Sequence, residues 1–423
     1  MGGGLVQLIA YGAQDIYLTG QPQITFFKSV YRRYTNFAIE SIKQTINGSI
    51  SFGSKTSITI SRDADLLKQI WVEYSPQEML SGVNNNVVCA NVGHTLIDYV
   101  EILIGGQLID RHYGKWLTIW NYLTDTNPSG QQGYIDTLGA GPGESSVDGD
   151  SATNIQLPRP TKYDRMAYTH RANLNVSNST EAPIRAWVPL QFWFCRNPGL
   201  ALPLVALQYH QVTINIGFAQ YNSITDAPAP TGMEFNNFSV YADYIYLDTS
   251  ERRIYAQNSH EYIIDQLQVM SNETRNSSTL TFNHPVKELI WSRVPDFFVN
   301  ESTPAGPASP PSRFTMSTNI SPNYYRLILN GTDRFTERDI TYFTRNQVWE
   351  SHTGFGSVMY PDSVAVYSFS LRPEEHQPSG TCNFSRLDLA QLNRTVADPI
   401  DIYALNYNVL RVTSGMAGLA FSN

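Results

Sequence analysis

Two similar stretches, "LLKQIWVEY" at residues 66–74 and "VKELIWSRV" at residues 286–294, reveal how this chain is organised. Each one follows a Thr-rich run, "SITIS" at residues 57–61 and "TLTFN" at residues 279–283. Short runs of aliphatic, aromatic and β-branched residues between polar segments are typical of β-strands. The same pair of strands is therefore predicted twice in one sequence.

Three further pairs of similar stretches follow in the same order in both halves. They are "VEILIGGQLIDR" at 100–111 with "YRLILNGTDRF" at 325–335, "FWFCRNPGLALP" at 192–203 with "YSFSLRPEEHQPSGTCNF" at 367–384, and "VYADYIYLDTSE" at 240–251 with "IYALNYNVLRVTSG" at 402–415. These pairs match Gly106 with Gly331, Gly199 with Gly380 and Tyr241 with Tyr403. The segments between these matched residues are longer in the first half than in the second. We expect two similar β domains in tandem, each a sandwich or jelly roll.

Further strands are predicted at residues 37–48, 55–61, 99–110, 186–195, 210–218 and 239–248. Two segments favour helices instead, residues 23–35 and residues 111–123. In the first, Phe27, Val30, Tyr31 and Tyr34 recur at i, i+3, i+4 and i+7, which is the pattern of one apolar helix face. We expect an N-terminal arm with this short amphipathic helix at 1–36, a first domain at 37–248 with a long loop at 124–183, a connector at 249–260 and a second domain at 261–423.

Charge and composition argue against broad nucleic-acid binding. The formal net charge is -8, and the sequence pI is about 5.5, whereas proteins that bind phosphate backbones are usually basic. The arm nevertheless mixes cations with aromatic residues: Phe26, Phe27, Lys28, Tyr31, Arg32, Arg33 and Tyr34. An amphipathic helix whose aromatic residues pack and whose cations stay in water explains this mixture, so no direct nucleic-acid binding is expected.

Motifs for catalysis or cofactors are not found in the sequence. The eight histidines show neither HxH nor HxxxH spacing, and no G-x-S-x-G occurs, so we predict no catalytic, cofactor-binding or metal-binding residues. Three cysteines at wide spacing, Cys89, Cys195 and Cys382, favour a reducing place of folding. The start of the chain lacks the pattern of a signal peptide, and no run of 18 apolar residues occurs. Among the N-x-[ST] sequons, Asn175, Asn178 and Asn300 fall in predicted loops and are candidate glycosylation sites.

Two other classes of function remain as alternatives. A carbohydrate-binding β-sandwich could use tryptophans as a sugar platform, and the chain has seven: Trp71, Trp116, Trp120, Trp187, Trp193, Trp291 and Trp349. Five of them lie in or beside apolar strand or helix patterns, which favours core packing. A cupin-type oxygenase or isomerase is disfavoured by the missing histidine motif.

Several long segments carry a family likeness. They are "GAQDIYLTGQPQITFFKSVYRRYTNFAIESI" at 12–42, "NPGLALPLVALQYH" at 197–210, "YIYLDTSERRIYAQNSHEYIIDQLQ" at 244–268, "HQPSGTCNFSRLD" at 376–388 and "NYNVLRVTSGMAGLAFSN" at 406–423. Together they resemble the major capsid protein of nucleocytoplasmic large DNA viruses, most of all the algal-virus and iridovirus branch. The resemblance runs from residue 5 to the last residue.

The resemblance implies an all-β double jelly roll, two tandem eight-stranded sandwiches with a few short helices. It also implies homotrimers, which form capsomers of pseudo-hexagonal outline that tile an icosahedral shell over an internal membrane. The arm, through about Phe37, would lie on the inner side and dock to minor capsid proteins and the membrane. The chain would be folded and assembled in the host cytoplasm and end in the virion. Two jelly rolls per chain in a three-fold ring give six similar sandwiches, which agrees with the repeat.

Overall fold

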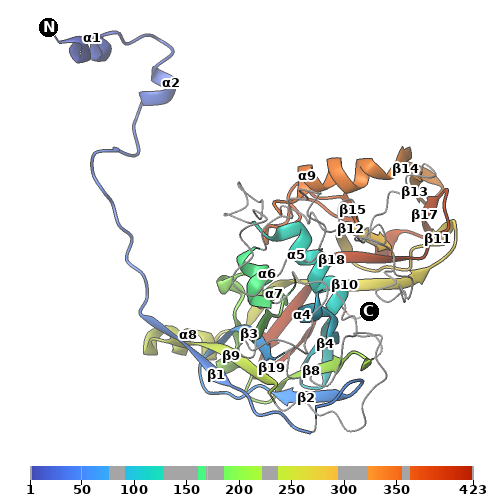
Figure 1. Ribbon diagram of the computed structural model, residues 1–423. Coiled ribbons are helices and arrows are strands. Elements are labelled where there is room, and N and C mark those ends of the chain that lie inside the picture. The colour runs from blue at the N-terminus through green and yellow to red at the C-terminus, as the bar shows by residue number, and fades with distance from the viewer. Residues whose placement is uncertain are drawn as a thin grey trace, which may run out of the picture. The chain divides into compact units, whose positions relative to one another are not determined.

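The computed structural model describes residues 2–48, 50–75, 91–126, 161–167, 169, 185–221, 237–293, 323–354 and 363–421 (Figure 1). The chain divides into two compact units, Met1–Asn36, which we call the arm, and Phe37–Asn423, which we call the body. The arm holds two short helices, α1 (Gly3–Ile9) and α2 (Ile16–Thr19), neither with a buried residue.

The first half of the body is a sandwich of two antiparallel sheets. One sheet has the order β1 (Phe37–Lys43), β9 (Ser239–Leu247), β3 (Leu66–Tyr74), β6 (Ala186–Pro189), with β7 (Leu202–Pro203) also paired to β3. The facing sheet has the order β2 (Lys55–Thr59), β8 (Val212–Phe218), β4 (Ile97–Ile104), β5 (Gln107–Tyr113). Strands far apart in the sequence are neighbours in both sheets, which is the jelly-roll arrangement.

The second half repeats this topology and adds one strand, β19. One sheet has the order β10 (His260–Glu273), β18 (Ile400–Thr413), β12 (Pro285–Arg293), β15 (Val364–Ser368), with β16 (Cys382–Asn383) paired to β12 and β19 (Met416–Leu419) paired to β18. The facing sheet has the order β11 (Ser277–Thr279), β17 (Ala390–Arg394), β13 (Tyr324–Leu329), β14 (Thr332–Asp339). The predicted tandem of two jelly rolls is confirmed.

Helices occupy the connections between strands. They are α4 (Val92–Thr95), α5 (Gly114–Thr124), α6 (Lys162–Ala167), α7 (Trp193–Arg196), α8 (Thr249–Gln257) and α9 (Gln347–Ser351). Short 3-10 turns cover Pro198–Leu200, Leu204–Ala206 and Phe384–Arg386, and a π-helix, Tyr342–Asn346, runs directly into α9. No helix in the described part of the chain is both long and apolar enough to cross a membrane.

The two jelly rolls share buried surface. Strands β10 and β18 pair over almost their whole length, from His260 opposite Val412 to Glu273 opposite Ile400. The start of β10 and the end of β18 extend to the first sandwich, where Ile264, Leu410 and Val412 pack in its core. This shared core explains why the body is one compact unit.

Strand predictions were accurate where the apolar pattern was strong. The run 66–74 is β3 with the predicted ends, and the run 99–110 is the β4–β5 hairpin. Residues 186–195 were predicted as one strand, but β6 ends at Pro189, which has no backbone N–H to continue the ladder, and a helical turn forms at Trp193–Arg196. The helix predicted at 111–123 is α5, which begins three residues later because β5 extends to Tyr113.

The helix predicted at residues 23–35 was wrong. Phe26 and Phe27 lie in a turn, and residues 29–36 form no regular element. The intended apolar face is exposed, with Phe27 98% accessible. A helix of this length gains most of its stability from packing. Aromatic and β-branched residues add little intrinsic helix propensity, so a periodic pattern without a partner surface does not make a helix.

The matched glycines of the two β-hairpins adopt the same conformation. Gly105 and Gly106 have φ of 59° and 84°, and Asn330 and Gly331 have φ of 48° and 78°. Two successive residues with positive φ form the tight turn that matches the twist of antiparallel strands. The pairing of Gly106 with Gly331 is therefore confirmed.

The repeat of residues 66–74 at residues 286–294 is present in the structure as strands β3 and β12, but the two strands match with a shift of one residue. Each strand has a bulge, at Lys68 in β3 and at Lys287 in β12. Aligned on the bulges, Trp71 corresponds to Ile290, and both lie opposite a matched tyrosine, Tyr241 or Tyr403. One residue of slip moves a side chain to the other face of a sheet.

Candidate functional site

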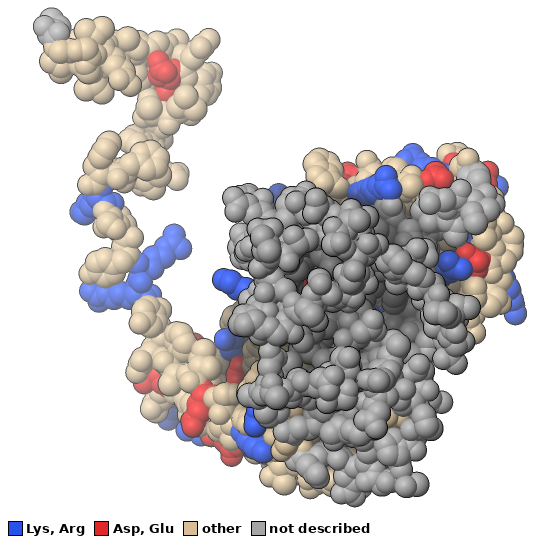
Figure 2. Space-filling view, in the orientation of Figure 1, with Lys and Arg blue, Asp and Glu red and all other residues tan. Residues whose placement is uncertain are grey.

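Residues 26–34 of the arm, which we predicted to dock, are mostly solvent-exposed. The exposed aromatic side chains include Phe26 at 88% and Phe27 at 98%. Lys28, Arg32 and Arg33 follow within one short segment, and Asp15 is the one acidic residue of residues 1–36, so the arm is net basic. In the space-filling view, Lys and Arg atoms gather on one stretch of the arm, and most of the rest is uncharged (Figure 2).

The candidate glycosylation sites Asn175, Asn178 and Asn300 lie outside the described residues.

A seam between the two jelly rolls is built around helix α5, which leaves the end of β5 and lies on the outer face of the second domain's sheet. The side chains of Trp116 and Trp120 are 0% and 7% exposed and belong to one buried cluster with Tyr403. The ring centroids of Trp116 and Tyr403 lie 5.5 Å apart. The buried cluster on this face has ten members: Trp116, Ile119, Trp120, Leu123, Leu267, Ile290, Val364, Val366, Tyr403 and Leu405. Burying aromatic rings on this scale stabilises the contact between the two sandwiches.

Ion pairs reinforce the seam. Lys115 Nζ lies 2.6 Å from Asp401 Oδ2 and donates to the carbonyl oxygen of Arg293 at 2.9 Å. Burial lowers the pKa of Lys115, and the Asp401 carboxylate offsets part of that effect. A charge removed from water needs a close partner, so this pair ties the start of α5 to β18.

A second ionic cluster lies where α7 meets β10. The Arg196 guanidinium stacks 3.9 Å from the Trp120 ring centroid and contacts Asp265 at 3.4 Å. Lys287, almost fully buried, reaches the same carboxylate at 3.2 Å. One carboxylate between two cations, beside an aromatic face, compensates the loss of hydration of all three charges.

A histidine clamp holds the end of α9. His352 Nε2 lies 3.0 Å from Glu288 on β12, and Nδ1 lies 2.9 Å from Glu374. Burial alone would lower the pKa of His352, but the Glu288 carboxylate and the hydrogen bonds to both acids outweigh it and raise the pKa to about 9. The imidazolium is therefore charged at neutral pH and bridges two acids.

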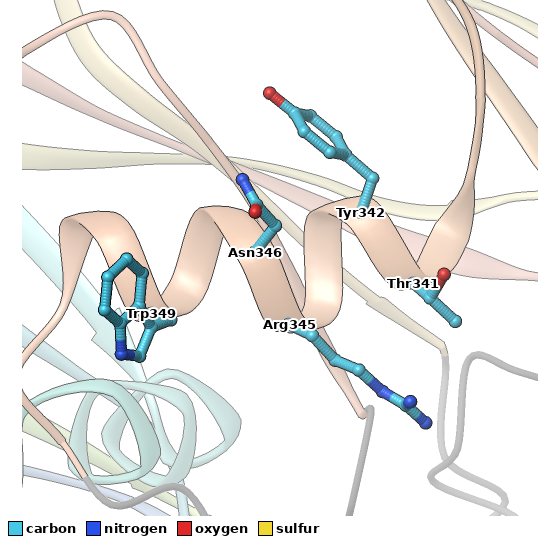
Figure 3. A pocket seen from close by; sticks show the side chains of 5 residues that line it. All are labelled: Thr341, Tyr342, Arg345, Asn346 and Trp349. Atoms are coloured by element: carbon cyan, nitrogen blue, oxygen red, sulfur yellow. The ribbon is translucent and has the colours of Figure 1, made fainter.

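The outer face of the α9 segment, which we define as residues 342–351, is a shallow depression (Figure 3). It is lined by Thr341, Tyr342, Arg345, Asn346 and Trp349, and Trp349 is 83% exposed. Figure 3 shows Trp349 near one end of the helix and Thr341 and Tyr342 near the other. Our sequence reasoning missed this helix, although Asp339 accepts from Thr341 N at 2.9 Å just before the segment, and Asp is among the residues that favour helix starts.

The alternative functions find little support in these positions. Of the seven tryptophans, Trp116, Trp120, Trp193 and Trp291 are buried and cannot form a sugar platform. Cys195 and Cys382 are free thiols, and burial raises the pKa of both. Among the described residues, no group of three His, Cys, Asp or Glu side chains is placed to hold a metal ion.

Comparison with known proteins covers both halves of the chain. Residues 25–248 match the family described as the major capsid protein N-terminus, and residues 251–418 match the family described as the large eukaryotic DNA virus major capsid protein. The major capsid protein of Pyramimonas orientalis virus is 43% identical, and that of Paramecium bursaria Chlorella virus 1 is 38% identical, each over the full length of both chains.

Solved structures agree with the sequence relatives. A chain of the PBCV-1 virus capsid superposes with a TM-score of 0.73 at 33% identity, covering 94% of this chain and 100% of that one. The Faustovirus major capsid protein superposes with a TM-score of 0.64 at 14% identity, covering 95% and 94%, which shows a shared fold. With two fused jelly rolls, capsid families matching both halves and full-length capsid relatives, the chain belongs to the major capsid proteins of large eukaryotic DNA viruses and has a structural role in the capsid.

Proposed function

We propose that three copies of this chain close into a capsomer of pseudo-hexagonal outline, and that such capsomers tile an icosahedral shell. The observation that carries this proposal is the pair of topologically matched jelly rolls joined in one body through the α5 seam. A ring of three such bodies presents six similar sandwiches while it keeps three-fold symmetry. The work of the protein is done by its interfaces and involves no catalytic step.

The domain layout that fits this role has an arm at 1–36, a first jelly roll at 37–248, a connector at 249–260 and a second jelly roll at 261–423. The start of β1 at Phe37, the end of β9 at Leu247, helix α8 and the start of β10 at His260 support these limits. The fused body keeps the relative placement of its two sandwiches, and a repeating shell requires subunits of one shape.

The arm is proposed to dock to minor capsid proteins and to the internal membrane. Its exposed aromatic residues, Phe26 and Phe27 among them, offer apolar contact area, and Lys28, Arg32 and Arg33 suit acidic protein surfaces or anionic lipid headgroups. No direct contact with nucleic acid is part of the proposal. Folding and assembly are placed in the host cytoplasm.

The experiment that tests the capsomer is the solution mass of the full-length chain, measured by light scattering after size exclusion at low micromolar concentration. The expected result is a species of three times 47.5 kDa. A monomer at every concentration would overturn the trimer.

A matched pair of variants tests the arm. Replacing Phe26 and Phe27 together by Ser should leave the trimer mass unchanged but weaken binding to vesicles or to minor capsid proteins. Replacing two exposed residues elsewhere, Tyr209 and Leu371, by Ser is the control. Equal binding by both variants would refute a docking role for the arm.

A further inference from the structure

The α9 segment matches α5 in position and in the spacing of its outer face. Each helix follows the last strand of its second sheet, β5 or β14, directly. The α5 residues that cover the neighbouring sheet are Trp116, Ile119, Trp120 and Leu123, and the residues that line the α9 depression include Tyr342, Arg345, Asn346 and Trp349. Both sets run i, i+3, i+4, i+7. The residue that follows the first member of each set also matches. Leu117 after Trp116 and Phe343 after Tyr342 each pack in the core of their own jelly roll.

The sheet that α5 covers also has a matched counterpart. Aligned on the bulges and cross-strand pairs, the outer-face residues Ile290, Val364 and Tyr403 correspond to Trp71, Trp187 and Tyr241 of the first domain's sheet. These three aromatic residues are half-buried rather than buried, and the rings of Trp187 and Tyr241 lie 5.4 Å apart. Within the part of the chain that the structure describes, the body thus has one helix face that no sheet covers and one matching sheet face that no helix covers.

Polar changes occur on both faces. Ile119 and Trp120 of α5 correspond to Arg345 and Asn346 of the α9 segment, while Leu405 of the covered sheet corresponds to Asp243 of the open one. The helix side thus carries a cation and an amide, and the sheet side carries a carboxylate, which accepts from Trp71 Nε1 within its own chain. This charge complementarity fits a contact that forms between separate molecules, because such interfaces are more polar than a permanent core.

We infer that the α9 face of one copy packs on the outer face of the β1-β9-β3-β6 sheet of a second copy, with Trp349 as the anchor. This contact repeats between copies the contact that α5 makes within one chain. It is head-to-tail, so it joins different surfaces of the two copies and closes into a ring when the rotation per copy is one third of a turn. The inference rests on the proposed trimer and assigns residues to its interface.

A photo-crosslinking amino acid in place of Trp349 tests the contact in the full-length chain. We expect a crosslinked species of twice the chain mass under denaturing conditions, and mass spectrometry should place the link within the strands of that sheet, residues 37–43, 66–74, 186–189 or 239–247. The same probe in place of Leu371, which is 82% exposed against 83% for Trp349, is the matched control and should not label those strands. Links from position 349 to any other surface would overturn the inference.

The Trp349→Asp variant adds an energetic readout. Because Trp349 is exposed within one chain, W349D should fold normally, which its thermal unfolding curve checks, yet should weaken self-association at least tenfold. L371D should keep the wild-type mass. A wild-type monomer would refute the proposed trimer. A wild-type trimer whose crosslinks from position 349 miss the sheet would refute this contact alone and leave the trimer standing.

Discussion

His352 and Glu288 form a fully buried ion pair, with Nε2 and Oε2 3.0 Å apart, that ties the end of α9 to the central strand β12. The second ring nitrogen contacts Glu374 at 2.9 Å, so one imidazolium joins three segments that are distant in the sequence. The charge of this ring therefore governs how firmly the α9 segment is held.

The clamp makes stability depend on pH on the alkaline side. The pKa of His352 rises from 6.5 in the unfolded chain to about 9 in the fold. Its contribution is complete below pH 6.5, where both states are protonated, and is lost as the pH rises to 9 and above. The loss should be roughly 3 kcal/mol, from 1.36 kcal/mol per pKa unit. Unfolding measured by circular dichroism from pH 6 to pH 10 tests this.

The His352→Gln variant supplies the control for that prediction. It should be less stable than the wild type at pH 6 and nearly equal to it at pH 10. A wild-type stability that stays level between pH 6.5 and 9 would contradict the charged clamp.

Removing the seam ion pair should be costly. Lys115→Met keeps the alkyl stem but leaves Asp401 without its cation, and we expect a loss of roughly 2 to 4 kcal/mol in the free energy of unfolding. Arg411→Met is the comparison, because it breaks a pair whose two side chains, Arg411 and Glu261, are 57% and 60% exposed. It should cost less than about 1 kcal/mol. Urea unfolding of both variants measures the difference. Equal losses would show that the seam pair is no stronger than a surface pair.

The two tryptophans of the opening repeat should differ in their effect on stability. Trp291 is fully buried against Tyr325 and Phe343, so Trp291→Ala should cost about 3 to 5 kcal/mol. Trp71 is half-buried on the outer face and donates to Asp243 at 2.8 Å, so Trp71→Ala should cost less than half as much. Urea unfolding at a protein concentration where the chain is monomeric gives both values. Similar losses would mean that the two residues are equivalent, as their alignment in the sequence suggests.

Substitution of either hairpin glycine should change the stability of the protein by a similar amount. Gly106 and Gly331 both have positive φ, and a side chain at either meets no atom within 4 Å. Alanine at either position should therefore cost only the left-handed strain, about 1 to 2 kcal/mol, while Asn at the same position should cost less. Thermal unfolding of G106A, G331A and G331N compares them. A large difference between G106A and G331A would argue against matched turns.

Much of the fold could be predicted because it depends on local patterns. Strand β3 and the β4–β5 hairpin were found from runs of apolar residues and from Gly106, and the second half from its similarity to the first. The candidate interface was only partly predictable. The arm residues were named but in the wrong conformation, and the α9 face was missed because its residues are mostly polar and its partner surface is not in the same chain.

The sequence by itself determined that there are two similar β domains, because a repeated order of strands and turns is a property of the chain. Only the tertiary structure decided which side of each strand is buried. Trp71 and Trp291 occupy the same place in their repeats yet face opposite sides, because the bulges at Lys68 and Lys287 sit one step apart in the aligned sequences. It also decided that α5 packs into the seam whereas residues 23–35 form no helix, since an amphipathic pattern becomes a stable helix only where another surface covers its apolar face.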